Sequence, residues 1–209
     1  MTVLELDTPH GSGRVHLHTV EAPRALLVLG HGAGGGVEAP DLVAARDAAL
    51  SEGIDVALAE QPYRVAGRRS PAPALHLDAA WTALVAGVRR DDLPLLVGGR
   101  SLGARVACRT AEATGAVAVL CLAFPLEPPG RAGKSPQSRL AELDAVTLPT
   151  LVVQGESDPF GIPPSGPSRR VVTVRGDHGL KADLGAVADA VRAWIVAFGL
   201  APAHGRPTI

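Results

Sequence analysis

The segment Leu95–Gly103 reads LLVGGRSLG and carries the clearest structural signal in the chain. A short apolar run leads into a Gly-x-Ser-x-Gly pattern formed by Gly99, Ser101 and Gly103. This pattern is typical of a sharp turn from a strand into a helix, where a Cβ at either glycine would clash and the serine hydroxyl stands exposed. The alternative interpretation is a glycine-rich turn whose serine only caps the helix.

Apolar runs of strand length recur on both sides of this segment. Continuous apolar runs suit strands that are covered by helices on both faces. The runs are Ala25–Leu29, Ile54–Ala59, Leu95–Gly98, Val117–Ala123, Thr150–Gln154 and Val171–Val174. Apolar residues at helical spacing occupy residues 42–50, 77–88, 102–113 and 184–198. The alternation predicts a doubly wound α/β sheet.

Two further runs near the start predict an antiparallel hairpin at one edge of that sheet. They are Val3–Leu6 and Arg14–Thr19, and we expect Thr8–Gly13 to form the loop between them. Later in the chain, the polar segment Glu127–Gln137 is rich in Pro and Gly and stands where a lid would be inserted. It is too short to hold a lid domain.

Length and composition exclude several classes of protein. The 209 residues fit one domain, which we expect over 1–198, followed by a frayed tail over 199–209. A formal net charge of −1 provides no long-range field for nucleic acid or an acidic membrane. No apolar run approaches the roughly 18 residues of a membrane span, and the start lacks a signal-peptide pattern. We therefore expect a cytoplasmic protein, and the abundance of Ala, Arg, Gly and Pro suggests a bacterial source.

The two cysteines, Cys108 and Cys121, lie in apolar stretches. In a chain without an export signal, this predicts buried free thiols rather than a disulfide. No Cys-x-x-Cys or His/Cys spacing points to zinc, so we expect no bound metal.

A serine hydroxyl is a weak nucleophile unless a histidine takes its proton and an acid orients that histidine. In folds with this turn, the acid and the histidine follow later strands. Asp158 follows the run 150–154, and His178 follows the run 171–174. The order Ser101, Asp158, His178 therefore predicts a catalytic triad. The alternatives are a turn role for Asp158 and an ordinary exposed loop position for His178.

The loop after the first parallel strand, Gly30–Gly36, reads GHGAGGG. Its glycines let backbone N–H groups turn inward, and we expect Ala33 to donate one N–H to an oxyanion and Leu102 to donate the other. His31 is then a residue that braces the loop. Its alternative role as the catalytic base is weaker, because it precedes Ser101 in the chain.

The same loop also fits a dinucleotide-binding fingerprint, Gly30-x-Gly32-x-x-Gly35, with Glu60 at the end of the next strand. This is the main alternative from another functional class. A predicted hairpin precedes the loop, and the alternative assigns no role to the serine, acid and histidine described above.

Arg64, Arg68 and Arg69 follow the strand Ile54–Ala59 on the predicted site edge of the sheet. A solvated surface loop is the favoured interpretation, and contact with an anionic substrate group is the alternative. We take Tyr63, Arg64 and Arg100 as candidates for substrate binding.

Five segments resemble the small lidless α/β-hydrolases: GHGAGGG (30–36), QPYRVAGRR (61–69), GGRSLG (98–103), QGESDP (154–159) and DH (177–178). The likeness is to bacterial dienelactone-hydrolase-like proteins and to the related domain of a eukaryotic group of testis-expressed proteins and chromatin-complex subunits. It implies an α/β-hydrolase fold with an eight-stranded, mostly parallel sheet. It also implies Ser101 as nucleophile, Asp158 as acid and His178 as base. A dienelactone hydrolase proper has cysteine in the place of Ser101.

The predicted protein is a serine hydrolase that cleaves a small ester, thioester or related acyl bond through a covalent acyl-enzyme. Its expected partner is a small acyl substrate, and it needs no cofactor. The alternatives are a non-catalytic interaction domain, as in some relatives implied by the resemblance, and the dinucleotide-binding module. The acyl group, the leaving group and the oligomeric state are left open.

Overall fold

The computed structural model describes residues 1–127 and 137–199. Its strands are β1 (Thr2–Thr8), β2 (Gly11–His18), β3 (Ala25–Gly30), β4 (Ile54–Glu60), β5 (Leu95–Arg100), β6 (Ala118–Leu122), β7 (Thr150–Gly155) and β8 (Arg169–Val174). They form one sheet in the order β1-β2-β4-β3-β5-β6-β7-β8. The strands β3 to β8 are parallel to their neighbours among themselves, whereas β1 and β2 are antiparallel additions at one edge. The predicted eight-stranded, mostly parallel sheet is confirmed.

The hairpin is tighter than the sequence predicts. Thr8 pairs with Gly11, so only Pro9 and His10 form the connection, and the expected loop over 8–13 is wrong. Gly13 belongs to the ladder, where it pairs with Leu6. A Cβ at this position would lie 2.8 Å from a side-chain carbon of Leu84, so this glycine marks close packing inside a strand rather than a turn.

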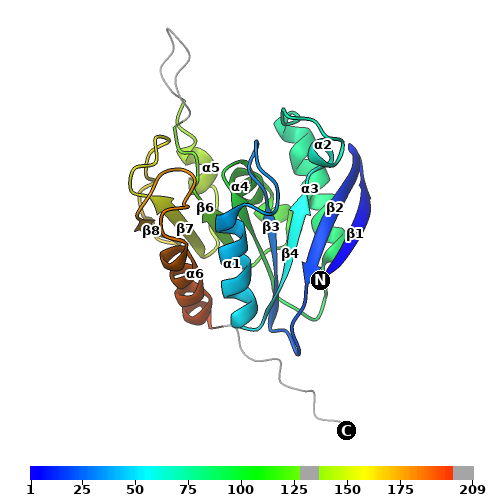
Figure 1. Cartoon of the computed structure of the whole chain (residues 1–209), viewed down its shortest axis with the longest axis horizontal. Helices are drawn as coiled ribbons and strands as arrows, with labels where there is room; N and C mark the ends of the chain where they lie inside the picture. Colours follow the sequence, from blue (N-terminus) through cyan, green and yellow to red (C-terminus); the bar gives the residue numbers. More distant parts are fainter. Residues whose placement is uncertain (128–136, 200–209) are drawn as a thin grey trace.

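Helices cover both faces of the sheet: α1 (Pro40–Ser51), α2 (Pro62–Val65), α3 (Ala74–Val88), α4 (Leu102–Thr114), α5 (Leu140–Asp144) and α6 (Leu184–Phe198). In Figure 1, α1 and α6 lie in front of the sheet, and α3 and α4 lie behind it. The four longer helices agree with the sequence pattern. The short helices α2 and α5 were not predicted, since four or five residues are too few to show helical periodicity.

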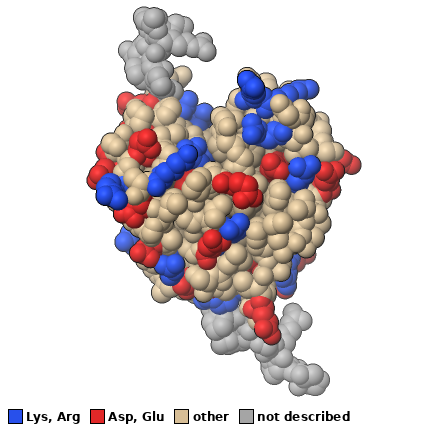
Figure 2. All heavy atoms as spheres, viewed as in Figure 1, with Lys and Arg blue, Asp and Glu red and all other residues tan. Residues whose placement is uncertain are grey.

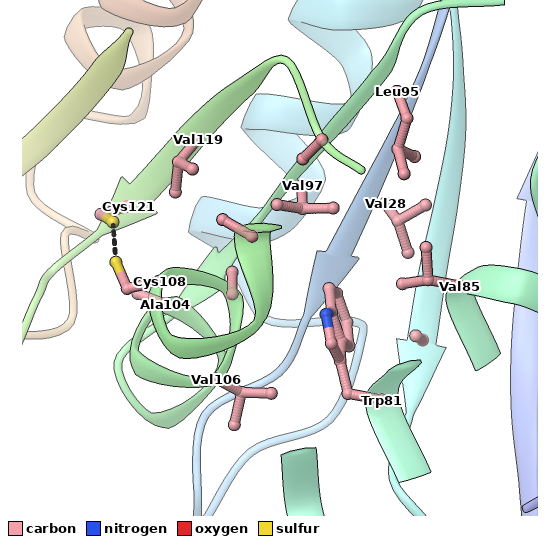
Figure 3. Packing of buried hydrophobic residues seen from close by; sticks show 14 of the residues in the cluster. Val28, Trp81, Val85, Leu95, Val97, Ala104, Val106, Cys108, Val119 and Cys121 are labelled. Carbon is pink, nitrogen blue, oxygen red and sulfur yellow. Dashed lines mark hydrogen bonds between the residues drawn. The ribbon is translucent and has the colours of Figure 1, made fainter. Parts of the chain in front are cut away.

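Each face of the sheet has its own apolar core, as expected for strands buried on both sides. Figure 3 shows part of the core on the α3 and α4 side, where Trp81 packs near Val28 and Val85. Cys108 and Cys121 meet there with their Sγ atoms 3.5 Å apart. Both are free and buried, which confirms the prediction for the thiols. The hydrogen bond to Cys108, together with burial, raises the pKa of the Cys121 thiol well above its usual value.

The described residues contain no helix long and apolar enough to cross a membrane, and they form no lid domain. Most of the segment expected at the lid position, 128–136, lies outside the described residues, as does the expected tail from residue 200 onward. α6 ends at Phe198, and Gly199 follows in the left-handed conformation that commonly ends a helix.

Candidate active site

Ser101 stands at the junction of β5 and α4 with φ 52° and ψ −108°. A side chain at positive φ is strained, and here neighbouring contacts hold the conformation. The Ser101 N–H donates to the carbonyl of Leu122 at 2.9 Å. A Cβ at Gly99 or Gly103 would lie 2.5 Å or 2.3 Å, respectively, from the carbonyl oxygen of Gly30. The serine hydroxyl does not cap α4, so the capping interpretation is wrong.

Three side chains that follow different strands form one chain of hydrogen bonds. The Nε2 atom of His178 lies 2.9 Å from Ser101 Oγ. The other ring nitrogen, Nδ1, lies 2.8 Å from Asp158 Oδ2. An ionised carboxylate only accepts, so Nδ1 carries the proton and Nε2 is free to accept the serine proton. The structure thus brings together the three residues that the sequence analysis singled out.

Neighbouring groups hold Asp158 in one orientation. Its side chain is fully buried, and its Oδ2 also accepts from Gln154 Nε2 at 2.8 Å. Its Oδ1 accepts from the backbone N–H of Phe160 at 2.9 Å. The Phe160 ring lies against the imidazole of His178, with centroids 4.4 Å apart. Asp177, the residue before His178, instead accepts from the N–H of Gly179, so its carboxylate serves the turn.

Arg100 braces the loop that carries the histidine. Its guanidinium donates to the backbone carbonyl of His178 at 2.9 Å. Its Nε lies 2.8 Å from Oδ2 of Asp41, a fully buried carboxylate whose pKa is raised by burial. Both contacts are made to the protein, so Arg100 positions the loop. The predicted substrate contact for Arg100 stays a prediction beside this positioning role.

Two backbone N–H groups are available for an oxyanion. Ala33 lies in the loop after β3, and Leu102 is the first residue of α4. Neither N–H has a hydrogen-bond partner within residues 1–127 and 137–199. The end of α4 that carries Leu102 is also its positive end. The role of these two N–H groups as oxyanion donors stays a prediction.

His31 and Tyr63 hold the loop that contains Ala33 through hydrogen bonds. The Nε2 atom of His31 accepts from the Gln61 N–H at 3.1 Å, so its Nδ1 donates to the Gly32 carbonyl at 2.8 Å. Burial lowers the pKa of His31, which keeps the ring neutral. The Tyr63 hydroxyl donates to the Ala33 carbonyl at 3.1 Å, and burial raises the pKa of Tyr63 to about 12. The Tyr63 hydroxyl thus holds the loop, and the substrate contact predicted for Tyr63 stays a prediction.

Arg64 lies in α2, at the carboxyl end of β4, and Arg68 and Arg69 follow in an exposed loop. None of the three makes an ion pair or a side-chain hydrogen bond with any residue that the structure describes. Figure 2 shows the basic side chains gathered over the α2 region. No contact joins Arg64 to the serine, histidine and aspartate, so its predicted substrate role stays a prediction.

The dinucleotide alternative does not fit the loop. In that motif the glycine-rich turn runs directly into a helix, and the third glycine allows close packing of the helix against the strand. Here α1 begins only at Pro40, and a Cβ on Gly35 would meet nothing within 4 Å. Among the described residues, no group of three or more His, Cys, Asp or Glu side chains is placed to hold a metal ion.

Residues 23–182 match the family model for the alpha/beta hydrolase domain. The chain belongs to this family. The matched segment runs from just before β3 to just after the histidine loop, so it includes every strand end described above. No curated protein matches this hydrolase-family chain in sequence.

Solved structures with the same fold include bacterial proteins. The hydrolase-family chain is similar to XC6422 from Xanthomonas campestris, described as an α/β serine hydrolase without a lid, at 19% identity over 94% of each chain and a TM-score of 0.76. It is similar to Est1E from Butyrivibrio proteoclasticus at 16% identity, over 93% of this chain and 98% of that one, with a TM-score of 0.76. A dienelactone hydrolase from Anabaena variabilis gives 16% identity, 94% and 96% coverage, and a TM-score of 0.73. The predicted likeness to lidless and dienelactone hydrolases is confirmed at the level of the fold, whereas the likeness to the testis-expressed group stays a prediction.

Sequence reasoning missed several residues of this hydrolase-family site. Gln154 is fully buried at the end of β7 and donates to Phe124, Asp158 and Gly161. A polar residue inside an apolar run is a signal that points to such a role. Asp41 offered no signal, since its partner Arg100 lies 59 residues away in the chain.

Proposed function

We propose that the chain is a serine hydrolase that cleaves small esters, thioesters or related acyl bonds. The observation that carries the proposal is the unbroken chain of hydrogen bonds from Ser101 Oγ through His178 to the buried Asp158 carboxylate. The fold does not require a hydroxyl at this strained position, since the Ser101 side chain makes no cap hydrogen bond. A serine whose hydroxyl lies 2.9 Å from a histidine therefore points to catalysis. Membership of the hydrolase family and the fold shared with a lidless serine hydrolase support the same conclusion.

In the proposed mechanism, Ser101 attacks the acyl carbon while His178 Nε2 accepts the hydroxyl proton. Asp158 keeps the imidazole in place and stabilises its protonated form. The N–H groups of Ala33 and Leu102 hold the oxygen that becomes negatively charged, and each such donor lowers the barrier by about 3 kcal/mol. His178 then gives the proton to the leaving group, and water releases the acyl group from Ser101 by the same steps.

A fluorophosphonate probe tests the proposal, because it labels serines that a neighbouring base activates. We expect the wild-type protein and Ser157→Ala to be labelled equally and Ser101→Ala not to be labelled. Ser157 is a suitable control, since it is exposed and its hydroxyl only donates to the Gly176 carbonyl. Equal labelling of Ser101→Ala and the wild type would refute the assignment. A panel of short-chain nitrophenyl esters and thioesters then identifies the acyl preference.

The alternative function, a non-catalytic interaction domain, makes the opposite prediction. Such a domain would show neither probe labelling nor ester turnover, and Ser101→Ala would leave its partner binding unchanged. The N–H groups of Ala33 and Leu102 have no hydrogen-bond partner among the described residues, and this supports the enzyme, since free backbone donors can hold an oxyanion.

A further inference from the structure

A cavity opens beside α2, at the edge of the sheet where the carboxyl ends of the parallel strands meet. Its volume is about 490 Å³, which lies within the usual range for small-molecule sites. The walls come from the turn between β1 and β2, from α2 and the loop after it, and from the first half of α3. Neither the three residues of the proposed triad nor the two oxyanion donors line it. It is therefore a site in addition to the one proposed for acyl hydrolysis.

The cavity is lined by both apolar and polar side chains. Pro62, Val65, Leu77 and Ala80 are among its apolar residues. The exposed imidazoles of His10 and His76 also line it, and they stack with their centroids 3.9 Å apart and their planes at 13°. Stacking holds together two groups that carry N–H donors, although they come from distant parts of the first 80 residues.

The lining is cationic and has no carboxylate of its own. Arg68 is part of it, and no Asp or Glu is among the lining residues. The whole segment from Gln61 to Leu77 contains no acidic residue. In the described part of the chain, three acids lie next to lining residues, and each is engaged by another group. Asp7 accepts the hydroxyl of Ser12 at 3.0 Å. Glu60 lies 3.0 Å from Nε2 of His16, and Asp78 pairs with Arg109 at 2.6 Å.

Arg68, in the loop after α2, differs from the arginines of the longer helices. Those on α4, for example, are held by acids: Arg105 by Glu142, and Arg109 by Asp78. Arg68 has no such partner among the residues in the described ranges. Arg64 and Arg69 likewise have no ion-pair partner among the described residues, and Figure 2 shows basic side chains gathered over α2. A guanidinium in this position is free to bind a carboxylate or a phosphate through its planar pair of N–H groups.

We infer that this cavity binds a small organic anion, a carboxylate or a phosphate monoester with an apolar body. Arg68 would pair with the charged group, and the imidazole N–H groups of His10 and His76 would donate to it. The apolar lining residues would cover the hydrocarbon part. Two wall residues have a further role, since Gln61 and Tyr63 hold the loop that carries Ala33. Gln61 and Tyr63 thus line the cavity and also contact the loop after β3, whereas Ala33 and Leu102 do not line the cavity.

Calorimetric titration with benzoate tests the inference, and the full-length Ser101→Ala protein makes the result independent of hydrolysis. Benzamide has the same shape without the charge, and phenyl phosphate distinguishes the two kinds of anion. We expect benzoate or phenyl phosphate to bind one per chain and benzamide to bind at least about tenfold more weakly. The Arg68→Gln change should weaken anion binding at least about tenfold. The matched change Arg69→Gln removes the same charge from a residue outside the lining and should cost less than about threefold.

Three results would overturn the inference. The first is no saturable binding of either anion at millimolar concentrations, and the second is equal binding of benzoate and benzamide. The third is an equal loss in the two arginine variants, which would indicate a surface field rather than a site. Amide shifts in a nitrogen–proton correlation spectrum locate the ligand, and they should fall within residues 10–12 and 61–80. Thermal unfolding of both variants checks that they are folded, and each side chain is exposed.

Discussion

The substitution Asp158→Asn tests the geometry of the proposed triad more sharply than removal of the nucleophile. All groups that contact this carboxylate are donors: His178 Nδ1 and Gln154 Nε2 on Oδ2, and the Phe160 N–H on Oδ1. An amide has one accepting oxygen and one donating nitrogen. Either the two donors on Oδ2 or the single donor on Oδ1 must therefore lose its acceptor.

The structure decides which side loses it. Gln154 cannot turn its amide around, because its Nε2 also donates to the carbonyls of Phe124 and Gly161 at 3.1 and 2.9 Å. The new oxygen therefore stays toward Gln154 and His178, and the new NH₂ group faces the N–H of Phe160. The unpaired donors should lower the free energy of unfolding by about 1–3 kcal/mol.

The imidazole keeps its tautomer in this arrangement but loses its counter-charge. Two unit charges about 4 Å apart interact with about 4 kcal/mol at an effective dielectric constant of 20. This corresponds to a decrease of about 10³-fold in the rate of acylation. It is smaller than the decrease of about 10⁴-fold that follows when an asparagine also reverses the tautomer.

The assay is the second-order rate constant of labelling by a fluorophosphonate, with kcat/KM for a nitrophenyl ester as a second readout. Asp177→Asn is the matched control, because the amide oxygen can still accept the Gly179 N–H and the same charge is removed nearby. We expect less than about a threefold change for this control. A decrease of less than tenfold for Asp158→Asn, or an equal decrease in both variants, would refute the reasoning.

Three further predictions follow from packing and titration. The chain has one tyrosine, so the absorbance of tyrosinate reports Tyr63 alone. We expect Tyr63 to titrate near pH 12 in the folded protein. The free energy of unfolding should fall between about pH 10 and 12, because the unfolded chain loses this proton at lower pH than the folded protein does. Gly99→Ala places a Cβ 2.5 Å from a carbonyl oxygen and should lower the free energy of unfolding by about 1–3 kcal/mol or more, whereas Gly34→Ala, in open space, should change it by less than about 0.5 kcal/mol in urea titrations. Cys108 and Cys121 should be unreactive toward a thiol reagent in the native protein and should give two thiols per chain in urea; rapid native labelling would contradict their burial.

The sequence was most informative where a single physical rule links chain order to space. In a parallel sheet, the carboxyl ends of the strands meet at one edge, so residues that follow separate strands come together. Ser101, Asp158 and His178 could be grouped on this basis alone, as could the loop that contains Ala33. The long amphipathic helices were predicted for a related reason, since their apolar spacing repeats over several turns.

Other features could not be predicted, because they depend on which side chain fills a given space. The glycine at position 13 resembles a turn residue until Leu84 is seen to pack against it. The sequence places Asp158 after a strand, but only the tertiary structure shows that its carboxylate faces the imidazole while that of Asp177 closes a turn.

By itself, the chain's pattern of apolar runs, glycines and strand-end residues determined the α/β sheet and the edge on which its polar groups converge, because burial and backbone geometry act through local sequence. The tertiary structure alone decided how those groups are held. Arg100 meets Asp41 and the carbonyl of His178 across gaps of 59 and 78 residues. Gln154 donates to the carboxylate of Asp158, and the Tyr63 hydroxyl donates to the carbonyl of Ala33. Such contacts join residues from distant parts of the chain, and their directions depend on the packing of the whole domain.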